Sequence, residues 1–110
     1  MERDAIEMKA RMDRVADHYG VESRMSILEE ECAELIQAIS KLRRAGAWPP
    51  PTPEGRQRYI AARTNLSEEL ADVLNLVVQT IHLLGNAEMV RFWLDHKLKR
   101  TIRDMEAEDG

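Results

Sequence analysis

The sequence predicts an all-α fold, and three observations support that fold class. Apolar residues recur at spacings of three and four, which is the pattern of an amphipathic helix. No segment alternates apolar and polar residues with the period of two expected for a half-buried strand. All four prolines lie in residues 49–53, so the long segments on either side contain no helix breaker. We therefore expect a four-helix bundle.

The first two helices are predicted from the glycines that follow them. The first helix covers about residues 3–18 and stops near Gly20, and the second covers about residues 23–44 and stops near Gly46. Glycine commonly follows the end of a helix because it adopts the left-handed backbone conformation at little cost.

The second half of the chain is predicted in the same way. Residues 45–64 are expected to form a proline-rich loop, with a short helix over residues 56–64 as the alternative for its second half. The third helix covers about residues 66–84 and stops at Gly85. The fourth helix follows Asn86, a residue type that caps helix N-termini well. The last residues, 106–110, are expected to be a frayed tail.

Composition and charge limit the classes of function. The chain of 110 residues suffices for one core, so we expect a single domain over residues 1–110. Its net charge of −4 argues against nucleic acid as a partner, because nucleic-acid affinity comes mainly from cations that neutralise phosphates. No apolar run approaches the roughly 18 residues that span a bilayer, and the N-terminal residues include acids instead of an apolar signal core. We therefore expect no membrane partner and a cytoplasmic location.

The second helix carries acidic residues on its apolar face. In a projection at about 100° per residue, Glu31 falls between Ala38 and Leu42, inside the apolar arc. Glu34 falls beside Ile27, at the edge of that arc. Residues three apart are neighbours on a helix surface, so the two carboxylates form a pair beside the packing face.

The third helix repeats this pattern. Glu69 falls between Leu76 and Thr80 in projection, and Asp72 falls next to Leu83. If the two helices pack face to face, their four acids converge. Burying several carboxylates together is unfavourable unless something neutralises them, and lysine and arginine are scarce on these faces.

Two interpretations of the four acids follow from the residues alone. Mg²⁺ prefers oxygen ligands, and one or two such ions would neutralise the cluster. The alternative is ordinary charge patterning, because acids favour the positive end of a helix dipole and often form a solvated face. Two acid pairs on two packing faces are harder to explain as charge patterning, but both interpretations stay open at this point.

The same acids carry a resemblance to a known family. Residues 30–34 read E-E-x-x-E, and residues 69–72 read E-x-x-D. The two motifs, in this order on two helices joined by a loop, resemble the signature of the MazG-like, all-α nucleoside triphosphate pyrophosphohydrolases. The resemblance extends over about residues 16–103.

The resemblance implies a reaction and a cofactor. Members of that family split a nucleoside triphosphate between the α and β phosphates, giving a nucleoside monophosphate and pyrophosphate. Carried over residue by residue, the ligands of Mg²⁺, or of Mn²⁺ as a substitute, would be Glu31, Glu34, Glu69 and Asp72. Glu30 would lie close by and orient or deprotonate water, so Glu30 and Glu31 are the catalytic candidates. The expected role is cleaning of the ribo- or deoxyribonucleotide pool.

Three cations near the C-terminus are candidates for phosphate binding. Lys97, Arg100 and Arg103 match the K-x-x-R-x-x-R pattern found in small members of the family. Such cations bind phosphate oxygens with charge-assisted hydrogen bonds. The alternative is a helix end that carries cations because they suit its dipole.

Four further residues are candidates for contacts with the base or with a ligand water. His18 and Tyr19 precede the first motif helix, in a region that contributes to the base pocket in the family, although they could equally be a surface and a packing residue. Asn75 and Gln79 share a helix face with Asp72 and could read a base, orient a water or simply be solvated. A phosphoribosyl-ATP pyrophosphohydrolase, which shares the first motif, and a non-catalytic helical interaction module are the alternative functions.

The remaining expectations concern packing and assembly. From their helix faces, Trp93 and Cys32 are expected in the core and His82 on the surface. The apolar arc of the third helix spans more than half of its circumference, which suggests a second packing partner. Because family members are dimers or dimers of dimers, we expect a homodimer or homotetramer with the motif helices central to the interface. The alternative is a compact monomer.

Overall fold

The computed structural model describes residues 2–110, which form four helices. These are α1 (Glu2–Tyr19), α2 (Val21–Arg44), α3 (Pro53–Leu84) and α4 (Ala87–Asp109). The described residues contain no strand, so the all-α, four-helix prediction is confirmed. Within that part of the chain, every helix is too short or too polar to cross a bilayer.

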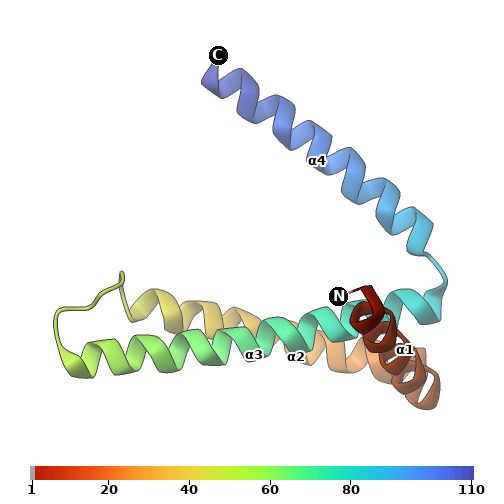
Figure 1. Cartoon of the computed structure of the whole chain (residues 1–110), viewed down its shortest axis with the longest axis horizontal. Coiled ribbons are helices and arrows are strands. Elements are labelled where there is room, and N and C mark those ends of the chain that lie inside the picture. Colours follow the sequence, from red (N-terminus) through yellow and green to blue (C-terminus); the bar gives the residue numbers. More distant parts are fainter. Residues whose placement is uncertain (1) are drawn as a thin grey trace.

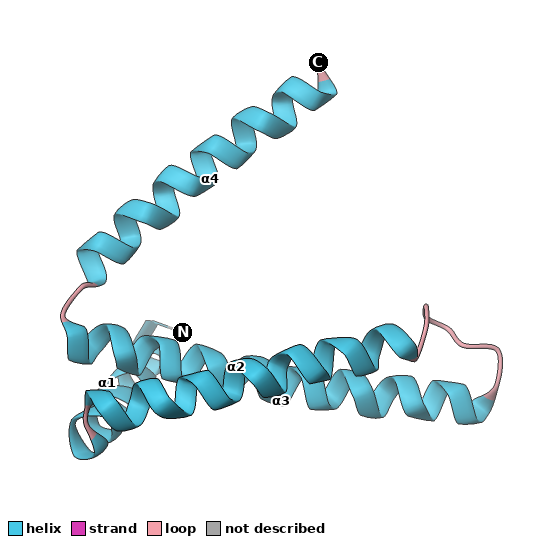
Figure 2. Ribbon diagram, turned by 180° about the vertical axis from the view of Figure 1, so that it is seen from behind, coloured by secondary structure: helices cyan, strands magenta, loops and turns pink. Residues whose placement is uncertain are grey.

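The two motif helices pack against each other, as the sequence predicts. Helices α2 and α3 run side by side in opposite directions and form a long hairpin (Figure 1). Helix α1 lies across the end of this hairpin opposite the connecting loop and contacts mainly α3. Helix α4 leaves that same end and extends away from the other three helices, as both views show (Figures 1 and 2).

Helix α3 begins earlier than the sequence analysis expects. It starts at Pro53 rather than at about residue 66, so the irregular connection ends at Thr52 and does not extend to residue 64. Residues 56–64 are helical, as the alternative for this segment expects, but they continue into α3 without a break. The hydroxyl of Thr52 accepts a hydrogen bond from the Gly55 amide at 3.0 Å, and Pro53 occupies the first helical position, where its missing N–H leaves no bond unmade. Pro53 therefore starts the helix, whereas Pro49, Pro50 and Pro51 lie in the irregular connection.

The glycine boundaries agree with the prediction, whereas the C-terminal boundary does not. Gly20, Gly46 and Gly85 all have positive φ angles, of 87°, 84° and 64°. Residues other than glycine adopt such angles only at an energetic cost. Asn86 precedes α4 as expected, but its side chain makes no capping hydrogen bond. The expected frayed tail is helical, because α4 continues to Asp109.

One chain buries little apolar surface. The buried hydrophobic residues among residues 2–110 are Ala16, Ala38 and Leu76. The accessible surface is 8901 Å², against about 6,200 Å² for a compact monomer of this mass. The radius of gyration is 18.0 Å, against about 13 Å for a compact chain of this length. The single chain is therefore extended, and much of its apolar surface has no partner within it.

Helix α4 shows this most clearly, because none of its residues is buried. Its large apolar side chains are all about half exposed or more: Met89, Phe92, Trp93, Leu94, Leu98, Ile102 and Met105. The expected core position of Trp93 is wrong for the single chain, since that residue is 49% exposed. Cys32, also expected in the core, is exposed on α2. Both residues lie on faces that no other residue of the described chain, 2–110, buries.

Candidate metal centre

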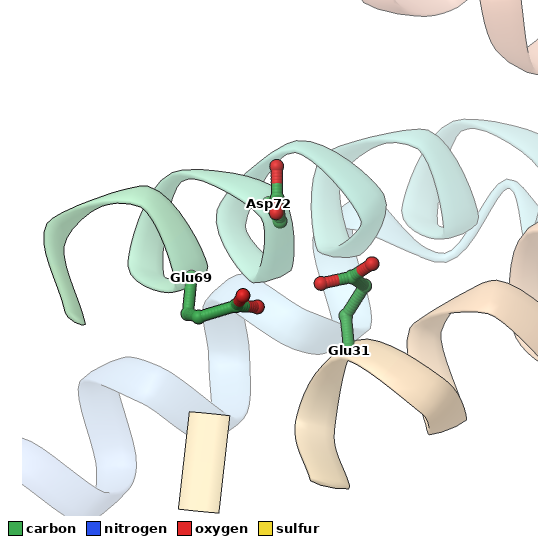
Figure 3. Close-up of side chains that lie close together, drawn as sticks. All are labelled: Glu31, Glu69 and Asp72. Carbon is green, nitrogen blue, oxygen red and sulfur yellow. The ribbon is translucent and has the colours of Figure 1, made fainter. Parts of the chain in front are cut away.

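Three of the predicted acids meet where α2 faces α3. One carboxylate oxygen each from Glu31, Glu69 and Asp72 lies within 4.8 Å of the other two. Glu31 projects from α2 and the other two from successive turns of α3, and the carboxylates of Glu31 and Glu69 point toward each other (Figure 3). The antiparallel hairpin thus brings the two sequence motifs together.

The cluster contains buried oxygens without partners. Glu31 Oε2 and Glu69 Oε2 are both inaccessible to solvent, and neither accepts a hydrogen bond. No lysine or arginine forms an ion pair with these acids among the ion pairs of residues 2–110. A buried carboxylate oxygen without a donor, a proton or a cation is strongly disfavoured.

The neighbouring acids and partial burial raise the pKa of Glu31 to about 7 from an ordinary value of 4.5. The largest cause is a hydrogen bond to Glu69, which Glu31 can donate only when it is protonated. Burial and the negative charges of Glu34, Asp72 and Glu69 also raise this pKa. Below about pH 7 Glu31 is therefore mostly protonated, and the metal-free cluster carries one negative charge fewer.

The other two predicted acids lie outside the three-residue cluster. Glu34 is exposed, but its charge acts on Glu31, so it belongs to the rim of the cluster. Glu30 is exposed on the neighbouring face of α2. Neither residue forms an ion pair within the described chain.

A second polar group on α3 begins at Asn75, one helical turn beyond Asp72. The buried side chain of Gln79, which is 1% exposed, donates a hydrogen bond from Nε2 to Asn75 Oδ1 at 2.9 Å. Arg24 on α2 donates from Nη1 to Gln79 Oε1 at 3.5 Å, and its guanidinium lies over the Tyr19 ring at 4.4 Å from the centroid. Of the predicted base-contact residues, the structure thus joins Asn75 and Tyr19 through Gln79 and Arg24.

The sequence analysis named Gln79 with Asn75 on the helix face of Asp72, but it missed Arg24, although a signal existed. Arg24 precedes Glu31 by two helical turns, and Gln79 follows Asp72 by two turns, so each lies on the same helix face as a cluster acid. His18 is exposed at the end of α1 and packs edge-on against Tyr19, at 4.7 Å between ring centroids.

His82 differs from its expected exposed position. Its Nε2 lies 2.8 Å from Asp17 Oδ1, its Nδ1 lies 3.4 Å from Asp13 Oδ1, and its side chain is half-buried. These contacts tie α1 to α3. The prediction was wrong because it used only the face of α3 and no information on where α1 packs.

The three predicted phosphate-binding cations lie apart from the cluster in a single chain. Lys97, Arg100 and Arg103 are exposed on α4, which extends away from the α2–α3 hairpin (Figure 2). None of them forms an ion pair with an acid of the cluster in the described residues.

One known protein family matches most of the chain. The model of the MazG nucleotide pyrophosphohydrolase domain matches residues 19–105. The chain belongs to the MazG family. No curated protein and no solved structure matches the chain. The MazG match confirms the resemblance seen in the two motifs, and it indicates nucleotide pyrophosphohydrolase activity in general.

Divalent-metal dependence is general in the MazG family, and the residues present fit such an ion. All three cluster ligands are carboxylate oxygens, which are the donors that Mg²⁺ and Mn²⁺ prefer. Two of the carboxylates offer buried oxygens that no protein group satisfies. A cation between α2 and α3 would satisfy both oxygens and remove the repulsion that raises the pKa of Glu31.

Proposed function

We propose that this MazG-family chain hydrolyses a ribo- or deoxyribonucleoside triphosphate and water to the nucleoside monophosphate and pyrophosphate, with Mg²⁺ or Mn²⁺. The ion would be held by Glu31, Glu69 and Asp72, with Glu34 at the rim. The observation that carries the proposal is the pair of buried, unpartnered oxygens of Glu31 and Glu69 in an all-oxygen cluster. Cleaning of the cytoplasmic nucleotide pool is the role that we assign to this reaction.

The ion would supply charge neutralisation for the phosphates and a lower pKa for a bound water. The protein residues supply position and proton transfer. Glu30 lies next to Glu31 in the chain, is exposed, and is not part of the cluster. It therefore remains available to accept the proton of the attacking water, as a general base must.

The nucleoside end of the substrate would lie along the polar group that begins at Asn75. Asn75 is one turn from Asp72, and its amide nitrogen is free to donate to a base. Tyr19 is more than half exposed, so its ring can accept a base or sugar in van der Waals contact. His18 beside it would complete this end of the site.

Binding of the phosphates by Lys97, Arg100 and Arg103 requires a second copy of the chain, because α4 extends away from the cluster of its own chain. We propose a homodimer or homotetramer, in which the apolar face of α4 packs against a neighbouring hairpin. The single chain exposes about 2,700 Å² more surface than a compact monomer, and a stable interface needs about 800 Å² per partner. The surplus is thus large enough for more than one interface.

The experiment that tests the reaction follows the products by phosphorus NMR. A panel of nucleoside and deoxynucleoside triphosphates is incubated with the protein and Mg²⁺. Equal amounts of monophosphate and pyrophosphate are expected, and EDTA should stop their release. Release of diphosphate and orthophosphate would overturn the proposed bond cleavage. Turnover of no triphosphate by folded protein would favour the non-catalytic module.

A further inference from the structure

The tip of the α2–α3 hairpin carries a charge opposite to that of the whole protein. Residues 41–63 contain six of the 16 Lys and Arg residues and only one of the 20 Asp and Glu residues. This segment therefore carries a formal charge of +5, and the rest of the chain carries −9. Such an asymmetry within one small chain indicates an anionic partner for the tip.

Three of these cations surround one pocket. A pocket of about 490 Å³ lies between the end of α2 and the first half of α3, and Lys41, Arg44 and Arg58 line it. None of the three forms an ion pair with any described acid. The dipole of α2 accounts for the first two, which lie in its last turn, but α3 offers no such stabilisation to Arg58.

An aromatic pair lies next to the cations. Trp48 packs on Tyr59, with ring centroids 5.2 Å apart, and Trp48 remains 53% exposed. Both line a second pocket of about 290 Å³, and Arg63 lines it as well. The two pockets lie on opposite faces of the first half of α3, because Arg58, Ala61 and Asn65 line the first and Tyr59, Arg63 and Ser67 line the second.

We propose that this tip binds single-stranded nucleic acid. The tip site comprises both pockets, and a strand that passes around the start of α3 would reach each of them. Lys41, Arg44 and Arg58 on one face and Arg63 on the other would contact phosphates, and a base would stack on Trp48 beside Arg63. Basic grooves combined with exposed aromatic rings are the general means of binding single strands, because every base has a face that can stack. A duplex keeps its bases stacked inside and offers Trp48 only the backbone. The net charge of the whole chain predicted no nucleic-acid partner, but the local charge at the tip supports one.

This inference does not depend on the proposed hydrolysis, and EDTA separates the two sites experimentally. The acidic cluster repels phosphates without a divalent cation, whereas the tip site needs none. The probe is a fluorescently labelled 12-nucleotide strand, measured by anisotropy in EDTA over a range of salt concentrations. Four phosphate contacts predict a slope of log K against log salt of about −2.8, at about −0.7 per contact.

Two variants test the residues. Arg44→Ala with Arg58→Ala should reduce the size of the slope by about 1.4, which corresponds to two lost contacts. The matched control, Arg11→Ala with Arg14→Ala, removes the same charge from exposed positions on α1 and should leave the slope unchanged. Trp48→Ala should weaken single-strand binding at least fivefold, since stacking on one base contributes about 1 kcal/mol or more.

Several results would overturn the proposal. Equal binding of duplex and single strand, with no effect of Trp48→Ala, would leave only non-specific charge attraction. An equal reduction of the salt slope in the tip variant and in the α1 control would also show only non-specific charge attraction. Tight binding of inorganic pyrophosphate without binding of the strand would identify a small-anion pocket instead. Circular dichroism checks that each variant is folded, which is expected because the substituted side chains are exposed.

Discussion

The acidic cluster should make the metal-free protein less stable as the pH rises from about 4.5 to about 7, and Glu31→Gln should remove this dependence. The pKa of Glu31 is 4.5 in the unfolded chain and about 7 in the folded one. Between these values the folded state binds more protons than the unfolded state. The free energy of unfolding therefore decreases with rising pH, since its slope follows the protons bound by the unfolded state minus those bound by the folded state.

The size of the effect follows from the same two values. Near pH 5.8, midway between them, folding takes up about 0.9 proton per chain at Glu31. Urea unfolding in EDTA at several pH values gives the slope for the wild type and for Glu31→Gln, and the difference between the slopes reports this proton. Glu29→Gln is the matched control, because Glu29 is an exposed neighbour outside the cluster. It should behave as the wild type.

Saturating Mg²⁺ should remove or reverse this difference, since the ion requires ionised carboxylates. Identical slopes for the wild type and Glu31→Gln in EDTA would refute the reasoning. They would mean that the three carboxylates do not lie together in solution.

Three further predictions concern the site, the assembly and a helix end. Glu69→Gln and Asp72→Asn should each abolish pyrophosphate release in the phosphorus NMR assay without lowering the melting temperature, because each removes one of several like charges; normal turnover by both would contradict the site. Leu98→Asp with Ile102→Asp should lower the mass measured by light scattering to 12.7 kDa, because both side chains are exposed in the single chain and would lie in the interface; an unchanged higher mass would exclude this face of α4. Gly85→Ala should lower the free energy of unfolding by about 1 kcal/mol, since alanine disfavours a φ of 64°, and an unchanged urea midpoint would contradict this.

The parts of the fold that depend on local sequence were predictable. The glycine boundaries and the helical period identified four helices, and the projection of Glu31 and Glu69 onto apolar faces identified the cluster before any coordinates. These features depend on backbone preferences and on neighbours within two turns. The start of α3 was missed because Thr52 and Pro53 were included in the loop, although they form a capping residue followed by a first-turn proline.

The features that depend on distant partners were not predictable in this way. His82 meets Asp13 and Asp17 only because α1 lies across the end of the hairpin. Burial of Trp93 was expected from its helix face, but a helix face does not say whether its partner belongs to the same chain. The exposed face of α4 is the clearest example, since its apolar pattern was recognised but no described residue of the same chain buries it.

The most direct test of the central claim measures divalent-metal binding at the acidic cluster. Mn²⁺ binding is followed by electron paramagnetic resonance in the presence of a triphosphate analogue with a non-hydrolysable α,β-methylene link. A spectrum of immobilised Mn²⁺ is expected for the wild type and should be lost in Glu69→Gln but retained in the control Glu29→Gln. Equal Mn²⁺ binding by the wild type and Glu69→Gln would contradict the assignment of the metal to the cluster between α2 and α3.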